Sequence, residues 1–116
     1  MILQKILLIL ESEDLCLALR DTLEPDCVVL VASDATVGVE LLPEHPDALI
    51  LDLILPGMDG LDFLYNNRSS LPPVILALTR FVDPKVLQIA DTLGVNHILM
   101  KPCSVSSIMR KLRSTL

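Results

Sequence analysis

Residues 47–60 read DALILDLILPGMDG, an apolar run that reaches the acid Asp52 and then enters a turn. A carboxylate among Leu and Ile side chains is costly to bury unless it is paired, binds a metal or reaches water. The Pro-Gly-x-Asp-Gly segment that follows favours a turn, so the apolar run ends there and Asp52 lies near the end of the predicted strand. The stretch therefore predicts a buried strand that presents Asp52 as a functional residue.

Four other apolar runs resemble the one that leads to Asp52. None of them alternates between apolar and polar residues, and such continuous runs are typical of strands buried on both faces of a parallel sheet. The five runs span residues 6–10, 27–32, 48–51, 74–78 and 97–100. We therefore expect one parallel sheet of five strands.

Segments with helical character separate these runs, at residues 13–23, 34–42, 61–67, 84–93 and 104–116. The fourth is the best marked, with Asp83 as N-cap, Pro84 at its first position and Gly94 just past its end. The order predicts an α/β fold, (βα)5, with helices on both faces of one doubly wound sheet. In such folds the functional crevice lies beyond the carboxyl ends of the strands.

Composition limits the classes of function. A chain of 116 residues, 52% of them hydrophobic, is expected to form a single domain over residues 1–116. The net charge of −6 disfavours direct binding to nucleic acid. The apolar run at residues 6–10 is too short to span a membrane. Three separated cysteines indicate reduced thiols and a cytoplasmic location. They are Cys16, Cys27 and Cys103, and the one basic cluster, at the end of the last helix, is Arg110, Lys111 and Arg113.

Polar side chains follow four of the predicted strands. Glu11 follows the first, Asp52 ends the third, Thr79 follows the fourth and Lys101 follows the fifth. Acids, a hydroxyl and an ammonium that converge at one sheet edge can bind a divalent cation and an anionic group together. Taken singly, each also has an ordinary structural explanation, as a helix acid, a cap or a solvated lysine. Their coincidence at one edge favours a phosphoryl-binding site with Asp52 as nucleophile.

The chain resembles the receiver domain of two-component response regulators over essentially its whole length. Residues 51–60, LDLILPGMDG, are similar to the phosphoacceptor segment of that family. Residues 76–79, LALT, and residues 100–102, MKP, are similar to its Thr/Ser and Lys-Pro motifs. Thr79 and Lys101 are 22 positions apart, which also fits the family. The resemblance implies a CheY-like, flavodoxin-like fold with strand order 2-1-3-4-5.

The resemblance also implies a function for these residues. Asp52 would accept a phosphoryl group from a sensor histidine kinase or phosphotransfer protein, and Thr79 and Lys101 would bind the phosphoryl oxygens. Mg²⁺ would be held by Glu11, Asp52 and the backbone carbonyl of Ile54. The bond before Pro102 would be cis. The domain would be a signalling module and not an enzyme, and it could form a homodimer through its last two helices.

Three positions depart from the family pattern. The family places two acids after the first strand, whereas this chain has Leu10 and Glu11, so we expect weak Mg²⁺ binding. Arg80 replaces a small residue beside Thr79 and either points into solvent or lies over Asp52, where it would modulate the site. Ile98 stands at the switch position usually held by an aromatic residue, and it is either packed like any strand residue or replaced in the switch by another element, for which Phe81 is a candidate.

These departures leave an alternative open. The chain is either a phosphorylatable receiver domain or a degenerate receiver that binds partners without phosphate. A flavodoxin-like cofactor binder is disfavoured, because residues 11–14, ESED, would repel a phosphate after the first strand. The sequence is compatible with a stand-alone regulator and with the front of a longer protein that carries an output domain.

Overall fold

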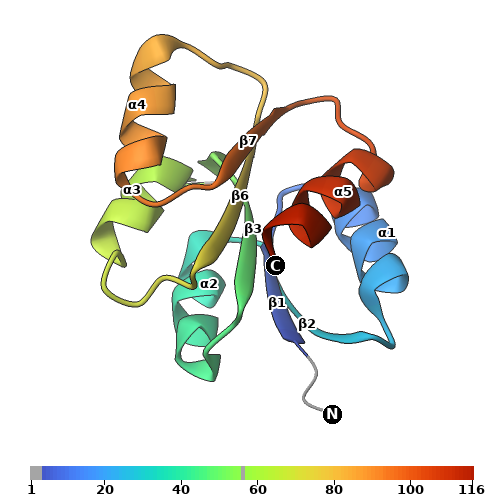
Figure 1. Ribbon diagram of the computed structural model, residues 1–116. Helices are drawn as coiled ribbons and strands as arrows, with labels where there is room; N and C mark the ends of the chain where they lie inside the picture. Colours follow the sequence, from blue (N-terminus) through green and yellow to red (C-terminus); the bar gives the residue numbers. More distant parts are fainter. Residues whose placement is uncertain (1–3, 56) are drawn as a thin grey trace.

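A computed structural model describes residues 4–55 and 57–116. Its main sheet has five parallel strands in the order β2-β1-β3-β6-β7, shown in Figure 1. Counted among these five strands alone, the order is 2-1-3-4-5, so the predicted fold class and strand order are confirmed. The strands are β1 (Gln4–Ile9), β2 (Cys27–Ala32), β3 (Ala48–Asp52), β6 (Val74–Thr79) and β7 (His97–Met100).

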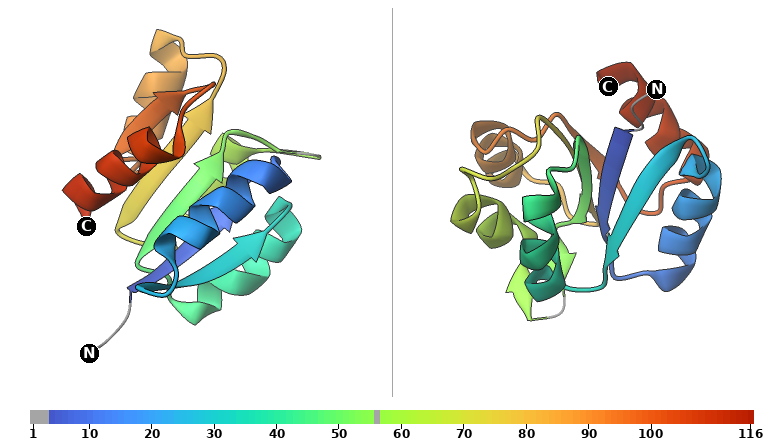
Figure 2. Two further views of the ribbon diagram at one scale, coloured as in Figure 1. Left: turned by 90° about the vertical axis from the view of Figure 1, so that its right-hand side faces the viewer. Right: turned by 90° about the horizontal axis from the view of Figure 1, so that it is seen from below.

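Helices cover both faces of the sheet, as the two views of Figure 2 show. Successive side chains of a strand point to opposite faces, so each central strand serves two cores. Leu7 and Ile9 pack in one core, with side chains from the helices on their face, whereas Ile6 and Leu8 pack in the other, with those of α1 and α5. The helices are α1 (Glu13–Leu23), α2 (Ala35–Leu41), α3 (Gly60–Asn66), α4 (Pro84–Thr92) and α5 (Val105–Thr115).

Burial of the strands differs between the centre and the edges of the sheet. All residues of β3 and β6 are buried, as expected for continuous apolar runs. The expectation was wrong for the edge strands, because Val28 and Val31 of β2 and Met100 of β7 are exposed. An edge strand has a neighbour on one side only, and the helices above and below it do not reach its outer side chains.

Helix boundaries follow the capping residues closely. The side chain of Asp83 accepts a hydrogen bond from Val86 N at 2.9 Å, and Gly94, with φ of +90°, follows the end of α4. The segment predicted at 34–42 differs, since Asp34 is the N-cap of α2 and the helix ends at Leu41. A short 3-10 helix, η1 (Leu42–Glu44), continues the chain there, because Pro43 is compatible with its first turn.

A small antiparallel hairpin follows β3 and was not predicted. It consists of β4 (Ile54–Leu55) and β5 (Met58–Asp59), and Gly57 has φ of +75° at its tip. Pro56, which the sequence assigns to this turn, lies outside the described residues, as do residues 1–3. The hairpin brings the chain from the end of β3 directly to the first residue of α3.

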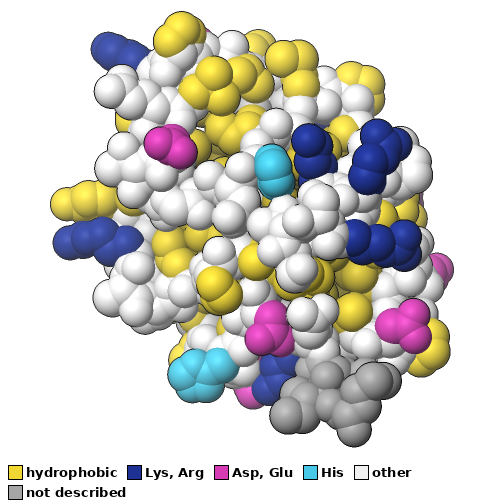
Figure 3. All heavy atoms as spheres, viewed as in Figure 1, with side chains coloured by type: hydrophobic (Ala, Val, Ile, Leu, Met, Phe, Trp, Pro, Cys, Tyr) yellow, Lys and Arg dark blue, Asp and Glu magenta, His cyan; other side chains and the backbone are white. Residues whose placement is uncertain are grey.

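The basic cluster of the last helix is on the surface. Arg110, Lys111 and Arg113 are all exposed, and Arg113 belongs to the last turn of α5. Lys and Arg side chains gather over this part of the molecule in Figure 3. The placement of Arg113 agrees with cations complementing the C-terminal end of a helix.

Candidate functional site

The carboxyl ends of the central strands surround a cleft of about 320 Å³. Side chains that the sequence assigned to four separate segments line it together. The parallel sheet brings them to one edge, because every strand ends there. The lining residues are Glu11, Ile54, Leu78, Thr79, Arg80, Phe81 and Lys101.

Asp52 lies beneath this cleft at the last position of β3, with 1% of its surface exposed. One carboxylate oxygen, Oδ2, accepts a hydrogen bond from the backbone N–H of Glu11 at 2.7 Å. The other, Oδ1, is 2.5 Å from Nζ of Lys101, and this ion pair is its only polar contact within the described residues. A buried carboxylate in contact with an ammonium and a backbone donor stays ionised far more cheaply than an isolated one.

The backbone around Asp52 is held by the start of α3. Gly60 N donates a hydrogen bond to Leu53 O at 2.6 Å, and Leu53 N donates to Leu78 O at 2.9 Å. A methyl group on Gly60 would lie 2.6 Å from the carbonyl oxygen of Asp52 and 2.6 Å from Cα of Leu53. Only glycine permits this approach, so the Asp59-Gly60 pair that caps α3 also fixes the backbone of the acid.

Thr79 ends β6 and is 4% exposed. Its hydroxyl Oγ1 is 3.3 Å from both the backbone N and the backbone O of Phe81, two residues further along. The ring of Phe81 is 70% exposed at the cleft. The hydroxyl is therefore tied to the loop that leads into α4, through contacts at the long end of the hydrogen-bond range.

Lys101 follows β7 and is positioned by its backbone. Its N–H donates to the carbonyl of Thr79 at 2.8 Å, so the lysine and the threonine leave neighbouring strands side by side. The peptide bond between Lys101 and Pro102 is cis. The ammonium reaches across the end of the sheet to the Asp52 carboxylate.

The two residues after β1 differ sharply in environment. Glu11 is exposed and lines the cleft, whereas Leu10 is 2% exposed and belongs to the apolar core. Across residues 4–55 and 57–116, no three His, Cys, Asp or Glu side chains form a cluster able to hold a metal ion. Glu11, Asp52 and the carbonyl of Ile54 nevertheless suit Mg²⁺, which takes one or two carboxylates and completes its shell with water. Oδ1 of Asp52 accepts no hydrogen bond, and to bind such an ion it would have to share or give up its contact with the Lys101 ammonium.

The two remaining predicted positions lie at different depths. Arg80 is exposed on the wall of the cleft, next to Thr79. Ile98 is half-buried in β7, opposite Ala77 of β6, and packs against the core without lining the cleft. Arg80 is thus close enough to act on an anion in the cleft, whereas Ile98 would act only through packing.

One contact at the site has no counterpart in the sequence prediction. Glu11 was expected to act through its carboxylate, but the group that contacts Asp52 is its backbone N–H. Every residue other than proline has this donor, so no residue type signals it.

The thiol of Cys103 is also near the site. Burial raises the pKa of this thiol, and the charge of Lys101 lowers it by a smaller amount.

The chain is similar to known proteins. The chain matches the response regulator receiver domain family over residues 6–113. It is 32% identical over 115 residues to the transcriptional regulatory protein LiaR of Bacillus subtilis, covering 95% of this chain and 54% of LiaR. It is 28% identical over 115 residues to the transcriptional regulatory protein CpxR of Escherichia coli K12, covering 98% of this chain and 50% of CpxR. The chain therefore spans about half the length of these curated relatives.

Solved structures give the same result for the fold. The chemotaxis response regulator CheY4 of Vibrio cholerae superposes with a TM-score of 0.86 at 25% identity, covering 99% of this chain and 100% of that one. Within the described residues, no helix has the length and apolar character needed to cross a membrane.

Proposed function

The chain belongs to the family of response regulator receiver domains, and from this membership we propose that Asp52 accepts a phosphoryl group from a phosphohistidine. The donor would be a sensor histidine kinase or a phosphotransfer protein. The observation that carries the proposal is the ion pair between Asp52 and Lys101, beneath a cleft at the carboxyl edge of the sheet. A nearly buried carboxylate with a single cation over one oxygen is suited to covalent chemistry at that oxygen.

In the proposed reaction, Oδ1 of Asp52 attacks the phosphorus of the phosphohistidine. An O–P bond forms as the P–N bond breaks, and the electron pair of the broken bond returns to the imidazole nitrogen of the donor. Oδ2 remains held by the N–H of Glu11, which keeps the carboxylate oriented. Since Lys101 covers Oδ1, the ammonium must move from the carboxylate to the phosphoryl oxygens as the group arrives.

Thr79 would provide the second donor to the phosphoryl group. Its hydroxyl would exchange the two 3.3 Å contacts with Phe81 for a hydrogen bond to a phosphoryl oxygen. Charge-assisted hydrogen bonds are shorter and stronger than neutral ones, so the exchange is favourable once the phosphate is present. The loop at Phe81 would then be released, and this loop substitutes for the aromatic switch that Ile98 lacks.

Receiver domains of this family generally bind Mg²⁺ at their acidic pocket. Here Glu11, Asp52 and the carbonyl of Ile54 would hold the ion, which when bound neutralises charge on the phosphoryl oxygens. We expect weak binding, because Leu10 is buried in the core and contributes no ligand. A Mg²⁺ titration followed by amide resonances tests the ligand set. Glu11→Gln should abolish the Mg²⁺-dependent shifts of the resonances, and shifts equal to those of the wild type would contradict the ligand set.

Arg80 would modulate the lifetime of the phosphorylated form. Arg80 lines the cleft, and its guanidinium would supply part of the positive charge that a weakly bound metal does not provide to the phosphoryl group. Arg80→Ala should shorten the lifetime of the acyl phosphate, whereas Arg110→Ala, an exposed arginine of α5, serves as the matched control. Equal lifetimes in the wild type and Arg80→Ala would remove Arg80 from the mechanism.

A degenerate receiver, which binds partners without phosphate, is the second candidate. It is favoured by the buried Leu10 and by the enclosure of Asp52, whose surface is 1% exposed. In that case the Asp52–Lys101 pair would be a permanent structural element. The protein would still be a signalling module of the same family, without enzymatic turnover.

One experiment separates the two candidates. The chain is incubated with Mg²⁺ and either acetyl phosphate or a phosphorylated histidine phosphotransfer domain, and its intact mass is measured. We expect one added phosphoryl group in the wild type and none in Asp52→Asn. If neither donor adds that mass with any divalent cation, the phosphoacceptor role is wrong and the degenerate receiver remains.

The wider setting of the domain is part of the proposal. LiaR and CpxR are named as transcriptional regulatory proteins, so we propose that this domain likewise controls an output function, in this chain or through a partner. A cytoplasmic location fits its three free cysteines. A homodimer through α4, β7 and α5 would follow phosphorylation, and sedimentation of the chain with and without acetyl phosphate tests this.

A further inference from the structure

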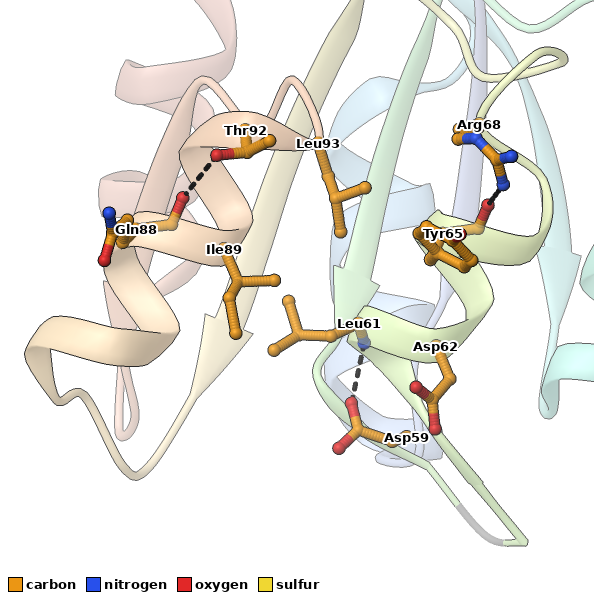
Figure 4. A pocket seen from close by; sticks show the side chains of 9 residues that line it. All are labelled: Asp59, Leu61, Asp62, Tyr65, Arg68, Gln88, Ile89, Thr92 and Leu93. Atoms are coloured by element: carbon orange, nitrogen blue, oxygen red, sulfur yellow. Dashed lines mark hydrogen bonds between the residues drawn. The ribbon is translucent and has the colours of Figure 1, made fainter.

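A groove between α3 and α4 lies apart from the strand-end cleft and shares no lining residue with it. Its volume of about 730 Å³ is within the range of ligand-binding pockets in proteins. Figure 4 shows the two helices as its walls. The residues that define its character are Leu61, Ile89 and Leu93, together with Asp59, Asp62 and Arg68.

The middle of the groove is apolar. Leu61 from α3 and Ile89 from α4 point toward one another across it, and Leu93 closes it at the end of α4 (Figure 4). Leu61 and Leu93 are half-buried, whereas Ile89 is 46% exposed. Apolar side chains that face each other around an open groove can bury further surface when an apolar group enters.

Charged side chains of opposite sign stand at the two ends of α3. Asp59 and Asp62 are exposed near its first turn, and Arg68 follows its last turn, as Figure 4 shows. The guanidinium of Arg68 is held in place, since Nη1 donates to Tyr65 O at 2.7 Å and Cζ is 4.3 Å from the centre of the Tyr65 ring. A cation that is already ordered loses little rotamer freedom when it pairs with an acid.

We propose that this groove binds an amphipathic helix of a partner protein. The helix would place two or three apolar side chains of one stripe against Leu61, Ile89 and Leu93, as helices do in apolar grooves. Its stripe would end in a basic residue that meets Asp59 and Asp62, and its opposite end would carry an acid that meets Arg68. Charge complementarity therefore favours a partner helix with a basic residue at one end and an acidic residue at the other. The inference does not depend on phosphorylation of Asp52.

The probe is a synthetic helical peptide with Leu at positions 4, 8 and 11, Lys at one end, Glu at the other and Ala elsewhere. It is titrated into the isotope-labelled chain, and binding is followed by amide resonances. We expect saturable shifts confined to α3 and α4. A peptide with Glu at both ends should bind several-fold more weakly, and Asp62→Lys should restore its affinity.

Matched variants on α4 test the apolar contact. Ile89→Ala should weaken binding by roughly fivefold or more, from the apolar surface lost. Leu87→Ala is the control, because Leu87 is 45% exposed on the same helix but does not line the groove. Equal effects of the two variants would overturn the proposal, and so would shifts that map to another face or fail to saturate at millimolar peptide. Self-association of the chain that Ile89→Ala abolishes would assign the groove to a second copy and would also overturn it.

Discussion

Replacement of Gly60 with alanine probes how the first residue of α3 holds Asp52 in position. The added methyl group would lie 2.6 Å from the Asp52 carbonyl oxygen and 2.6 Å from Cα of Leu53. Carbon atoms in contact are normally about 3.5–4.0 Å apart, so the overlap with Cα is about 1 Å. Both obstacles are backbone atoms, which cannot rotate away as a side chain would.

The expected loss of stability follows from two opposing terms. Overpacking against a rigid neighbour costs about 1–3 kcal/mol, and the upper part of this range applies because two backbone atoms must move. Alanine in a helix is up to about 1 kcal/mol better than glycine, which offsets part of the cost. We therefore expect Gly60→Ala to lower the free energy of unfolding by about 2 kcal/mol, with a fall in Tm of about 8 °C.

Urea denaturation followed by circular dichroism measures this change, and Gly38→Ala is the matched control. Gly38 lies inside α2, where a methyl group would meet Cδ1 of Ile9 at 2.5 Å. That atom is the end of a side chain and can turn aside, so we expect a smaller loss. The amide resonance of Glu11, which donates to Asp52, should shift only in Gly60→Ala. If Gly60→Ala is as stable as the wild type, or more stable than Gly38→Ala, the proposed support of Asp52 is refuted.

Three further predictions concern stability. Lys101→Met leaves the Asp52 carboxylate without its cation and should cost about 3 kcal/mol in urea denaturation, most of which Asp52→Asn in the same chain should restore; an unchanged midpoint would show that the pair contributes nothing. The side chain of Asn96 accepts a hydrogen bond at 2.7 Å from the N–H of Ile75, near the start of the buried strand β6. Asn96→Ala removes this acceptor and should lower the free energy of unfolding by about 1–3 kcal/mol, measured as a lower Tm. Burial raises the pKa of the Cys16 thiol above 9.0, so as pH rises the thiol loses its proton in the unfolded chain before it does so in the folded chain. The free energy of unfolding should therefore fall above that pH, and it should fall less steeply in Cys16→Ala. Parallel plots of the free energy of unfolding against pH for the two proteins would contradict this.

Local patterns predicted most of the fold. Strand and helix positions followed from five continuous apolar runs and from caps such as Asp83, because these act within a few residues of the chain. The strand order followed instead from the resemblance to receiver domains. The β4–β5 hairpin was missed, since its strands have two residues each and no periodicity. Exposure of Val28 and Val31 was missed as well, because the composition of a strand does not reveal whether it lies at the edge of the sheet.

The sequence by itself determined which chemical groups stand at the strand ends, namely the carboxylates of Glu11 and Asp52, the hydroxyl of Thr79 and the ammonium of Lys101. Their positions depend on strand length and turn residues, which are local properties. Only the tertiary structure decided which atoms meet: the Glu11 backbone N–H and the Lys101 ammonium contact Asp52. Contacts across neighbouring strands depend on register and on rotamers, and backbone donors are common to nearly all residues, so no local pattern specifies them.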